Sequence, residues 1–277
     1  MNTCDSTIPE GLKKVPPFPP VAARLLTLLS SPDVEVADVA ELIRSDATLS
    51  AKMLRCINSA AYGLGRPVND VRQAVALMGF ERTRQITAMC ATAAYAKGSR
   101  SNSELQASWQ HSMATAILAT EIATSCDAFA KVAFTAGILH DIGRLGLIVA
   151  YPSLYGSAVR CANGRCIDFL DFEREQFGLD HAQAGRLLAE AWELPEEFRI
   201  VAGRHHDPCE GAEVDLLRIV HVGCRLADAL GYGLTPPRTD TSMSAILDTL
   251  PQRARKHLDR TEEELRAQIE DRIHAII

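Results

Sequence analysis

The sequence predicts an all-α protein. Of its 277 residues, 47% are hydrophobic but only 5% are aromatic, and alanine and leucine are abundant, which is typical of helices packed by aliphatic side chains. Apolar residues recur every three or four positions in segment after segment, and no strand pattern stands out. The length leaves room for one large domain or two small ones with an ample core.

The first hundred residues predict five helices. Pro20 suits a helix start, because the N–H that proline lacks would be unpaired there anyway. Gly79 predicts a break between the last two of these helices. The segments with helical spacing of apolar residues are 20–29, 36–44, 48–57, 71–78 and 81–96.

Two features of this half have more than one interpretation. Asn58 and Ser59 can cap a helix end and order the turn to Gly63, which is the interpretation we prefer, or they can line a groove between lobes. The helices at 36–44 and 48–57 have the layout of a helix-turn-helix. Acidic residues along this pair, together with a formal net charge of −6, argue against binding to nucleic acid.

The polar stretch 97–103 is the clearest linker and predicts a boundary between an N-terminal lobe, 8–97, and a second lobe, 104–233. Asp180 is placed to cap one helix of the second lobe, and Pro195 to begin the next. Helices are predicted there at 105–124, 128–140, 145–149, 168–177, 181–192, 195–206 and 216–230.

A tail, 240–277, follows the second lobe and carries two further helical stretches, 243–247 and 261–277. The second begins with a capping box from Thr261 to Glu264. Its apolar stripe consists of Leu265, Ile269, Ile273 and Ile276. We expect this stripe to pack back on the domain, with self-association as the alternative.

The chain is expected to be cytoplasmic and not to enter a membrane. Its first residues lack the basic and then apolar pattern of a signal peptide. No uninterrupted apolar run reaches membrane-spanning length. The eight cysteines are scattered along the chain without a CxxC pair. We therefore expect them to be free thiols in a reducing compartment.

The chemistry of the sequence centres on His140 and Asp141, which end the apolar run 136–139 and precede Gly143, a residue expected to stop the helix. An imidazole nitrogen beside a carboxylate oxygen can ligate Fe, Mn, Zn or Mg. Alone, such a pair is more simply a buried histidine that donates a hydrogen bond to its neighbour. The order of the further histidines strengthens the metal interpretation: His111 before the pair, then His181, His205 and His206.

This order of histidines resembles the HD superfamily of metal-dependent phosphohydrolases. Segments 14–26, 43–60, 74–80 and 177–195, followed by His-His-Asp-Pro at 205–208, resemble more narrowly the HDOD (HD-related output domain) family. The resemblance covers about 8–233 and implies an N-terminal helical lobe packed on an HD-like helical lobe. It also implies a divalent metal centre formed by His111, His140, Asp141, His181, His205 and His206.

The sequence departs from the catalytic pattern of the HD relatives at three places. Cys224 stands where the resemblance implies a carboxylate ligand, and Asp228 lies one turn beyond. Arg144 stands where a catalytic lysine is expected, and 207–211 lacks the glycine-rich motif of the relatives that open cyclic di-GMP. We therefore interpret the metal site as degenerate.

The resemblance implies a non-enzymatic bacterial regulatory module that acts through protein contacts, with signalling proteins as partners: cyclic-di-GMP enzymes, kinases or response regulators. The competing hypothesis is an HD phosphohydrolase acting on a nucleotide or cyclic dinucleotide. A third is a domain that binds a nucleotide without cleaving it. No cofactor beyond a divalent metal is implied, and the sequence leaves the oligomeric state open.

Overall fold

The computed structural model describes residues 8–97, 102–162, 168–207, 213–235 and 242–276. All regular elements within these residues are helices, which confirms the predicted all-α class. Most of the predicted linker at 97–103 and the stop signal at Asn163 lie outside the described residues.

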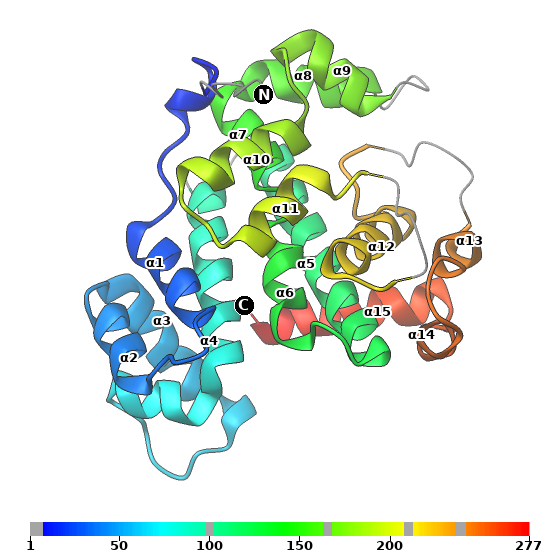
Figure 1. Cartoon of the computed structure of the whole chain (residues 1–277). Helices are drawn as coiled ribbons and strands as arrows, with labels where there is room; N and C mark the ends of the chain where they lie inside the picture. Colours follow the sequence, from blue (N-terminus) through cyan, green and yellow to red (C-terminus); the bar gives the residue numbers. More distant parts are fainter. Residues whose placement is uncertain (1–7, 98–101, 163–167, 208–212, 236–241, 277) are drawn as a thin grey trace.

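In the N-terminal lobe, short helices pack against one side of a long helix (Figure 1). Its helices are α1 (Pro20–Leu29), α2 (Val36–Arg44), α3 (Ala47–Ile57) and α4 (Val71–Lys97), with short 3-10 turns at η1 (Leu12–Lys14) and η2 (Ala60–Tyr62). Gly79 interrupts α4 with φ 77°, a left-handed value that suits glycine, so the predicted break is found. Asn58 is structural, because its amide pairs with the backbone of Val68 through bonds of 2.7 and 2.8 Å.

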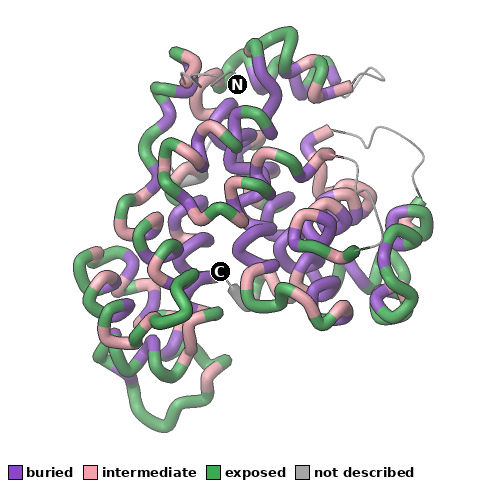
Figure 2. The backbone as a smooth tube through the Cα atoms, in the orientation of Figure 1, coloured by how far each residue is buried: buried purple, intermediate pink, exposed green. Residues whose placement is uncertain are grey.

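The second lobe is built on α5, which packs along α6 and α12 (Figure 1). Its helices are α5 (Ser103–Cys126), α6 (Ala130–Leu139), α7 (Ile142–Ala150), α8 (Pro152–Ala162), α9 (Phe169–Phe177), α10 (His181–Ala191), α11 (Glu196–Arg204) and α12 (Leu216–Ala229). We did not predict α8. Buried residues concentrate along α5, α6 and α7, in the middle of the molecule (Figure 2).

The expectation that Gly143 ends a helix is wrong. The break falls at His140 and Asp141, between α6 and α7, and Gly143 lies in the first turn of α7. Its function is close packing: a Cβ at this position would lie 2.0 Å from the His181 carbonyl oxygen and 2.2 Å from the Gly185 nitrogen, both on α10. The missing side chain lets the two helices meet, backbone to backbone.

The segment Ala130–Ala150 is long and apolar enough to cross a membrane, although charged and histidine side chains interrupt its apolar run. However, it consists of two helices, α6 and α7, and 89% of its most apolar window is buried inside the protein. The segment is apolar because it forms part of the protein core.

The C-terminal tail packs against α5. It forms α13 (Met243–Leu247), α14 (Gln252–His257), which we did not predict, and α15 (Glu262–Ile276). Leu265 and Ile269 of the predicted stripe are each 1% exposed. The carboxylate of Glu121 on α5 binds three side chains of the tail. It pairs with Arg272 at 2.5 Å and forms hydrogen bonds with His257 at 3.1 Å and Gln268 at 3.3 Å.

Glu121 therefore holds the tail on the domain. We expect Glu121→Ala to lower the free energy of unfolding by about 1–3 kcal/mol, because it leaves several donors without their shared acceptor. Urea unfolding measures this, and limited proteolysis should remove the tail of the variant first. Glu190→Ala is the control, because Glu190 pairs with Arg186 on the surface of one helix and should change stability by about 0.5 kcal/mol or less. Equal effects of the two variants would contradict this account.

Candidate metal centre

The fold brings all six predicted residues into one cluster, although they come from five helices. His111 lies on α5, His140 ends α6, Asp141 precedes α7, His181 begins α10, and His205 ends α11 with His206 next to it. His140, Asp141, His181 and His205 are each 1% exposed, and His111 is 3% exposed. Only His206 reaches an intermediate exposure.

The backbone and one carboxylate fix the orientation of three imidazoles. Nδ1 of His140 lies 2.6 Å from the Gly137 carbonyl, and Nδ1 of His205 lies 3.2 Å from that of Val201. Because a carbonyl only accepts, both Nδ1 atoms carry the proton. Nδ1 of His181 lies 2.6 Å from the Glu173 carboxylate and donates in the same way. The Nε2 atoms of these three histidines are thus left with lone pairs, as in ligated histidines, whose other nitrogen donates to a supporting acceptor.

The distances between donor atoms suit a shared ion. Nε2 of His111 and Nε2 of His140 are 3.3 Å apart, and Nε2 of His181 is 3.5 Å from Oδ1 of Asp141. Two ligands ~2.1 Å from one ion at a tetrahedral angle are ~3.4 Å apart. Three overlapping triads have all their ligand atoms within 4.8 Å: His111, His140 and Cys224; His140, Asp141 and His205; and His181, His205 and His206.

Unpaired buried atoms also point to an ion. Oδ1 of Asp141 and Nε2 of His205 have no hydrogen-bond partner, whereas Oδ2 of Asp141 forms an ion pair with Arg144 at 2.7 Å. Buried polar atoms of this kind are rare, because burial without a hydrogen bond is costly. The residues present therefore fit a divalent metal ion.

The pKa shifts keep the ligands in their binding forms. Burial lowers the pKa of His111 to about 3 and lowers the pKa values of His140, His205 and His206, so these rings are neutral at pH 7. Burial alone would raise the pKa of Asp141, but the neighbouring Arg144 charge holds it well below its usual value. The centre thus offers neutral imidazoles and one carboxylate.

Cys224 occupies the place that the sequence predicted. Its buried Sγ lies 3.5 Å from Nε2 of His111 and belongs to the first triad. Asp228 does not replace it as a ligand, because its Oδ1 lies 3.4 Å from Nδ1, on the other side of the His111 ring. Asp228 thus lies close to the ring without a hydrogen bond to it, and burial raises the pKa of this carboxyl group to about 7.

Sequence reasoning missed the supports around His181. Glu173 on α9 is fully buried and accepts from the backbone N–H of His181 at 2.8 Å and from the Tyr155 hydroxyl at 2.5 Å. Arg144 contacts both Asp141 and His181. The one available signal was the charge of Arg144 inside an apolar segment, whereas Glu173 lies in a helix with several other polar residues and offered none.

Nitrogen and sulfur donors favour borderline ions such as Zn²⁺, Co²⁺ or Fe²⁺ over Mg²⁺, which prefers oxygen. We therefore expect Cys224→Asp to raise the affinity for Mn²⁺ relative to Zn²⁺ by about tenfold or more. Competitive ion titration measures the ratio. Cys224→Ser is the control, since it removes the thiol without adding a carboxylate and should weaken Zn²⁺ without strengthening Mn²⁺. An unchanged ratio in Cys224→Asp would show that residue 224 is not a ligand.

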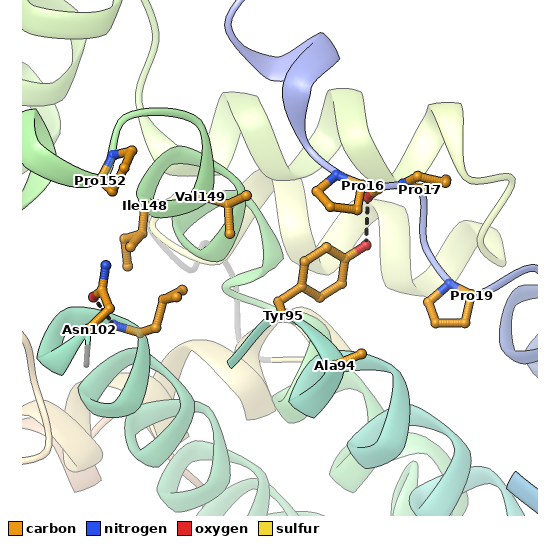
Figure 3. Close-up of a pocket in the computed structure, with 10 residues that line it drawn as sticks. Pro16, Pro17, Pro19, Ala94, Tyr95, Asn102, Ile148, Val149 and Pro152 are labelled. Atoms are coloured by element: carbon orange, nitrogen blue, oxygen red, sulfur yellow. Dashed lines mark hydrogen bonds between the residues drawn. The ribbon is translucent and has the colours of Figure 1, made fainter. Parts of the chain in front are cut away.

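A separate cavity of about 350 Å³ lies where the proline-rich segment crosses the ends of α4 and α7 (Figure 3). The Tyr95 hydroxyl closes one side by donating to the Pro16 carbonyl at 3.0 Å. None of its lining residues belongs to the histidine cluster: Pro16, Pro17, Pro19, Ala94, Tyr95, Asn102, Leu105, Ile148, Val149 and Pro152.

Known proteins share this fold and sequence pattern. An HDOD domain protein of unknown function from Geobacter sulfurreducens is 26% identical, with a TM-score of 0.73 over 95% of this chain and 91% of that one. A proposed phosphohydrolase from Shewanella amazonensis SB2B is 23% identical, with a TM-score of 0.68 over 92% of this chain and 94% of that one, a likeness of fold.

An uncharacterized protein of Treponema pallidum (strain Nichols) is 24% identical over 204 residues, which are 73% of this chain and 39% of that protein. The chain thus spans about two-fifths of this relative's length. The sequence pattern of the HDOD domain matches residues 15–208, well over half of the chain. The chain belongs to the HDOD family.

Proposed function

We propose that this chain is a bacterial regulatory module that acts through contacts with other proteins, and that its histidine cluster holds a divalent ion for structure rather than for hydrolysis. A bound ion would supply a cross-link between α5, which carries His111 within its length, and the ends of α6, α10 and α11. The cluster would then fix how these helices pack and which surface they present.

The burial of the cluster carries this proposal. A catalytic ion keeps an open position for water or substrate. Here the side chains of His140, Asp141, His181 and His205 are each 1% exposed or less. Among the described residues, burial to this degree leaves almost no surface of these four side chains for a phosphoester to contact. The cavity in Figure 3 offers no contact with them either, because other residues line it.

The partners we propose are cytoplasmic signalling proteins, such as cyclic-di-GMP enzymes, kinases or response regulators. The support is family membership, together with a charge of −6 that disfavours nucleic acid. The Treponema relative is more than twice as long as the matched segment, which suits a module that acts on or beside other domains.

The second candidate is a metal-dependent phosphohydrolase. Oδ1 of Asp141 and Nε2 of His205, which have no hydrogen-bond partner, favour it, because they are suited to an ion that could also activate water. Cys224 disfavours it, since a thiolate is a poor ligand for a hard ion that handles phosphate.

Turnover separates the two candidates. The purified chain, loaded in turn with Mn²⁺, Fe²⁺ and Zn²⁺, is assayed with bis(p-nitrophenyl) phosphate and with cyclic di-GMP. We expect no product beyond that of Asp141→Ala, the control that lacks the carboxylate. Product formation that Asp141→Ala and His140→Ala abolish would overturn the regulatory proposal in favour of the hydrolase.

A further inference from the structure

One permanent cation, the guanidinium of Arg144, lies inside the histidine cluster. Its Nε is 2.7 Å from Oδ2 of Asp141, and its Nη2 is 3.0 Å from Nε2 of His181. The side chain is 11% exposed, and its guanidinium carbon lies 5.8 Å from the centre of the Phe169 ring. Both contacted atoms are among those that could bind an ion.

The cluster has two halves, which differ in whether Arg144 contacts them. The half formed by His111, His140 and Cys224 makes no direct contact with Arg144 among the interactions of the described residues. The other half contains His181, His205 and His206. There Nε2 of His181 carries the lone pair that an ion would need, because the other nitrogen of this ring gives its proton to Glu173. Nη2 of Arg144 lies 3.0 Å from this atom and Nε2 of His206 lies 2.8 Å from it, so both stand where an ion would bind.

The balance of charge gives the same result. The fully buried carboxylates of Asp141 and Glu173 carry two negative charges, and Arg144 carries one positive charge. One divalent ion, together with the Cys224 thiolate that its binding would form, brings the sum to zero. A second divalent ion would add two buried positive charges, of which Asp228 could cancel only one, and unpaired buried charges are strongly unfavourable.

We propose that Arg144 takes the place of a second metal ion, so that the chain binds one divalent ion, in the half that contains His111, His140 and Cys224. Asp141 completes this position, since its carboxylate also lies within reach of His140. The inference rests on the ion-binding part of the proposed function and specifies the number and place of the ion.

Cobalt titration tests the number and the place together. The full-length chain, stripped of metal with a chelator, is titrated with Co²⁺ while bound ion is counted by elemental analysis after gel filtration. A thiolate ligand adds a near-ultraviolet sulfur-to-cobalt band, because metal binding deprotonates the thiol. We expect one Co²⁺ per chain, with this band, and loss of the band in Cys224→Ser.

Removing the guanidinium should open the second half. We expect Arg144→Met to bind two Co²⁺ per chain, with no stronger sulfur band for the second, and Arg144→Lys, which keeps the charge, to bind one. Arg144→Gln replaces Arg144→Met if far-UV circular dichroism shows that the latter is unfolded. Arg186→Met, a surface variant, is the matched control and should bind one.

The outcomes are distinct. Two ions in the unmodified chain, or one ion in the folded Arg144→Met or Arg144→Gln chain, would overturn the role of Arg144 and leave the regulatory proposal intact. No ion in any chain would overturn the ion centre itself, and the inference with it.

Discussion

Gly143→Ala should unfold the second lobe or prevent its folding, with a loss of free energy of unfolding of about 4 kcal/mol or more. The added methyl group would lie 2.0 Å from the backbone oxygen of His181 and 2.2 Å from the backbone nitrogen of Gly185. Neither atom can move without separating α7 from α10. Because α7 follows Asp141 and α10 begins at His181, the metal centre should be lost as well.

Gly65→Ala provides the matched control. Gly65 lies in an exposed turn, and no atom lies within 4 Å of a Cβ built there. The same change of one methyl group should leave stability within about 1 kcal/mol. Thermal unfolding, followed by circular dichroism, compares the two variants. A Gly143→Ala chain that melts with the unmodified protein would show that α7 and α10 do not pack as described.

Acidification should unfold the metal-free chain at a mild pH. Burial lowers the pKa values of four clustered histidines, that of His111 to about 3 from 6.5. Below pH 6.5 these histidines therefore bind protons in the unfolded chain but not in the folded one. The free energy of unfolding is highest above pH 6.5 and decreases as the pH falls. Asp228 acts in the opposite direction, because burial raises its pKa from 3.8 to about 7.

The four histidines outweigh the single carboxylate. Each group whose pKa differs between the folded and the unfolded chain contributes at most about 1.4 kcal/mol per pH unit, so we expect the free energy of unfolding to fall between pH 6 and pH 5. Urea unfolding in the presence of a chelator measures the slope. His205→Gln should reduce the slope of the free energy of unfolding against pH, because one fewer buried histidine takes up a proton on unfolding. His274→Gln, which changes an exposed histidine, should leave the slope unchanged. A stability that is constant or rises on acidification would contradict the burial of neutral histidines.

Helices were predictable where the local sequence determines them. The predicted bounds of α1 and α2 agree with the structure, and Asp180 caps α10 with the reciprocal bonds of a capping box. Gly143 was misinterpreted because a glycine after an apolar run usually marks a helix end. Its actual reason is contact with α10, almost forty residues later in the chain, which no local pattern records.

The centre was predictable as a set of residues but not as an arrangement. The spacing and order of the histidines, together with the family resemblance, identified all six residues that the fold gathers. The position of Asp228 behind His111 and the contact of Arg144 with His181 depend on how α7, α10 and α12 pack. Glu173 was missed because a charged residue in an amphipathic helix ordinarily faces water, whereas this one is fully buried.

Water proton relaxation in the Mn²⁺-loaded chain tests most directly whether the centre is closed to substrate. A buried ion surrounded by protein ligands has no rapidly exchanging water, so the account predicts a low relaxivity per bound Mn²⁺ that does not change when a phosphate ester is added. A high relaxivity that a phosphate ester lowers would show an open coordination position within reach of substrate and would contradict the account.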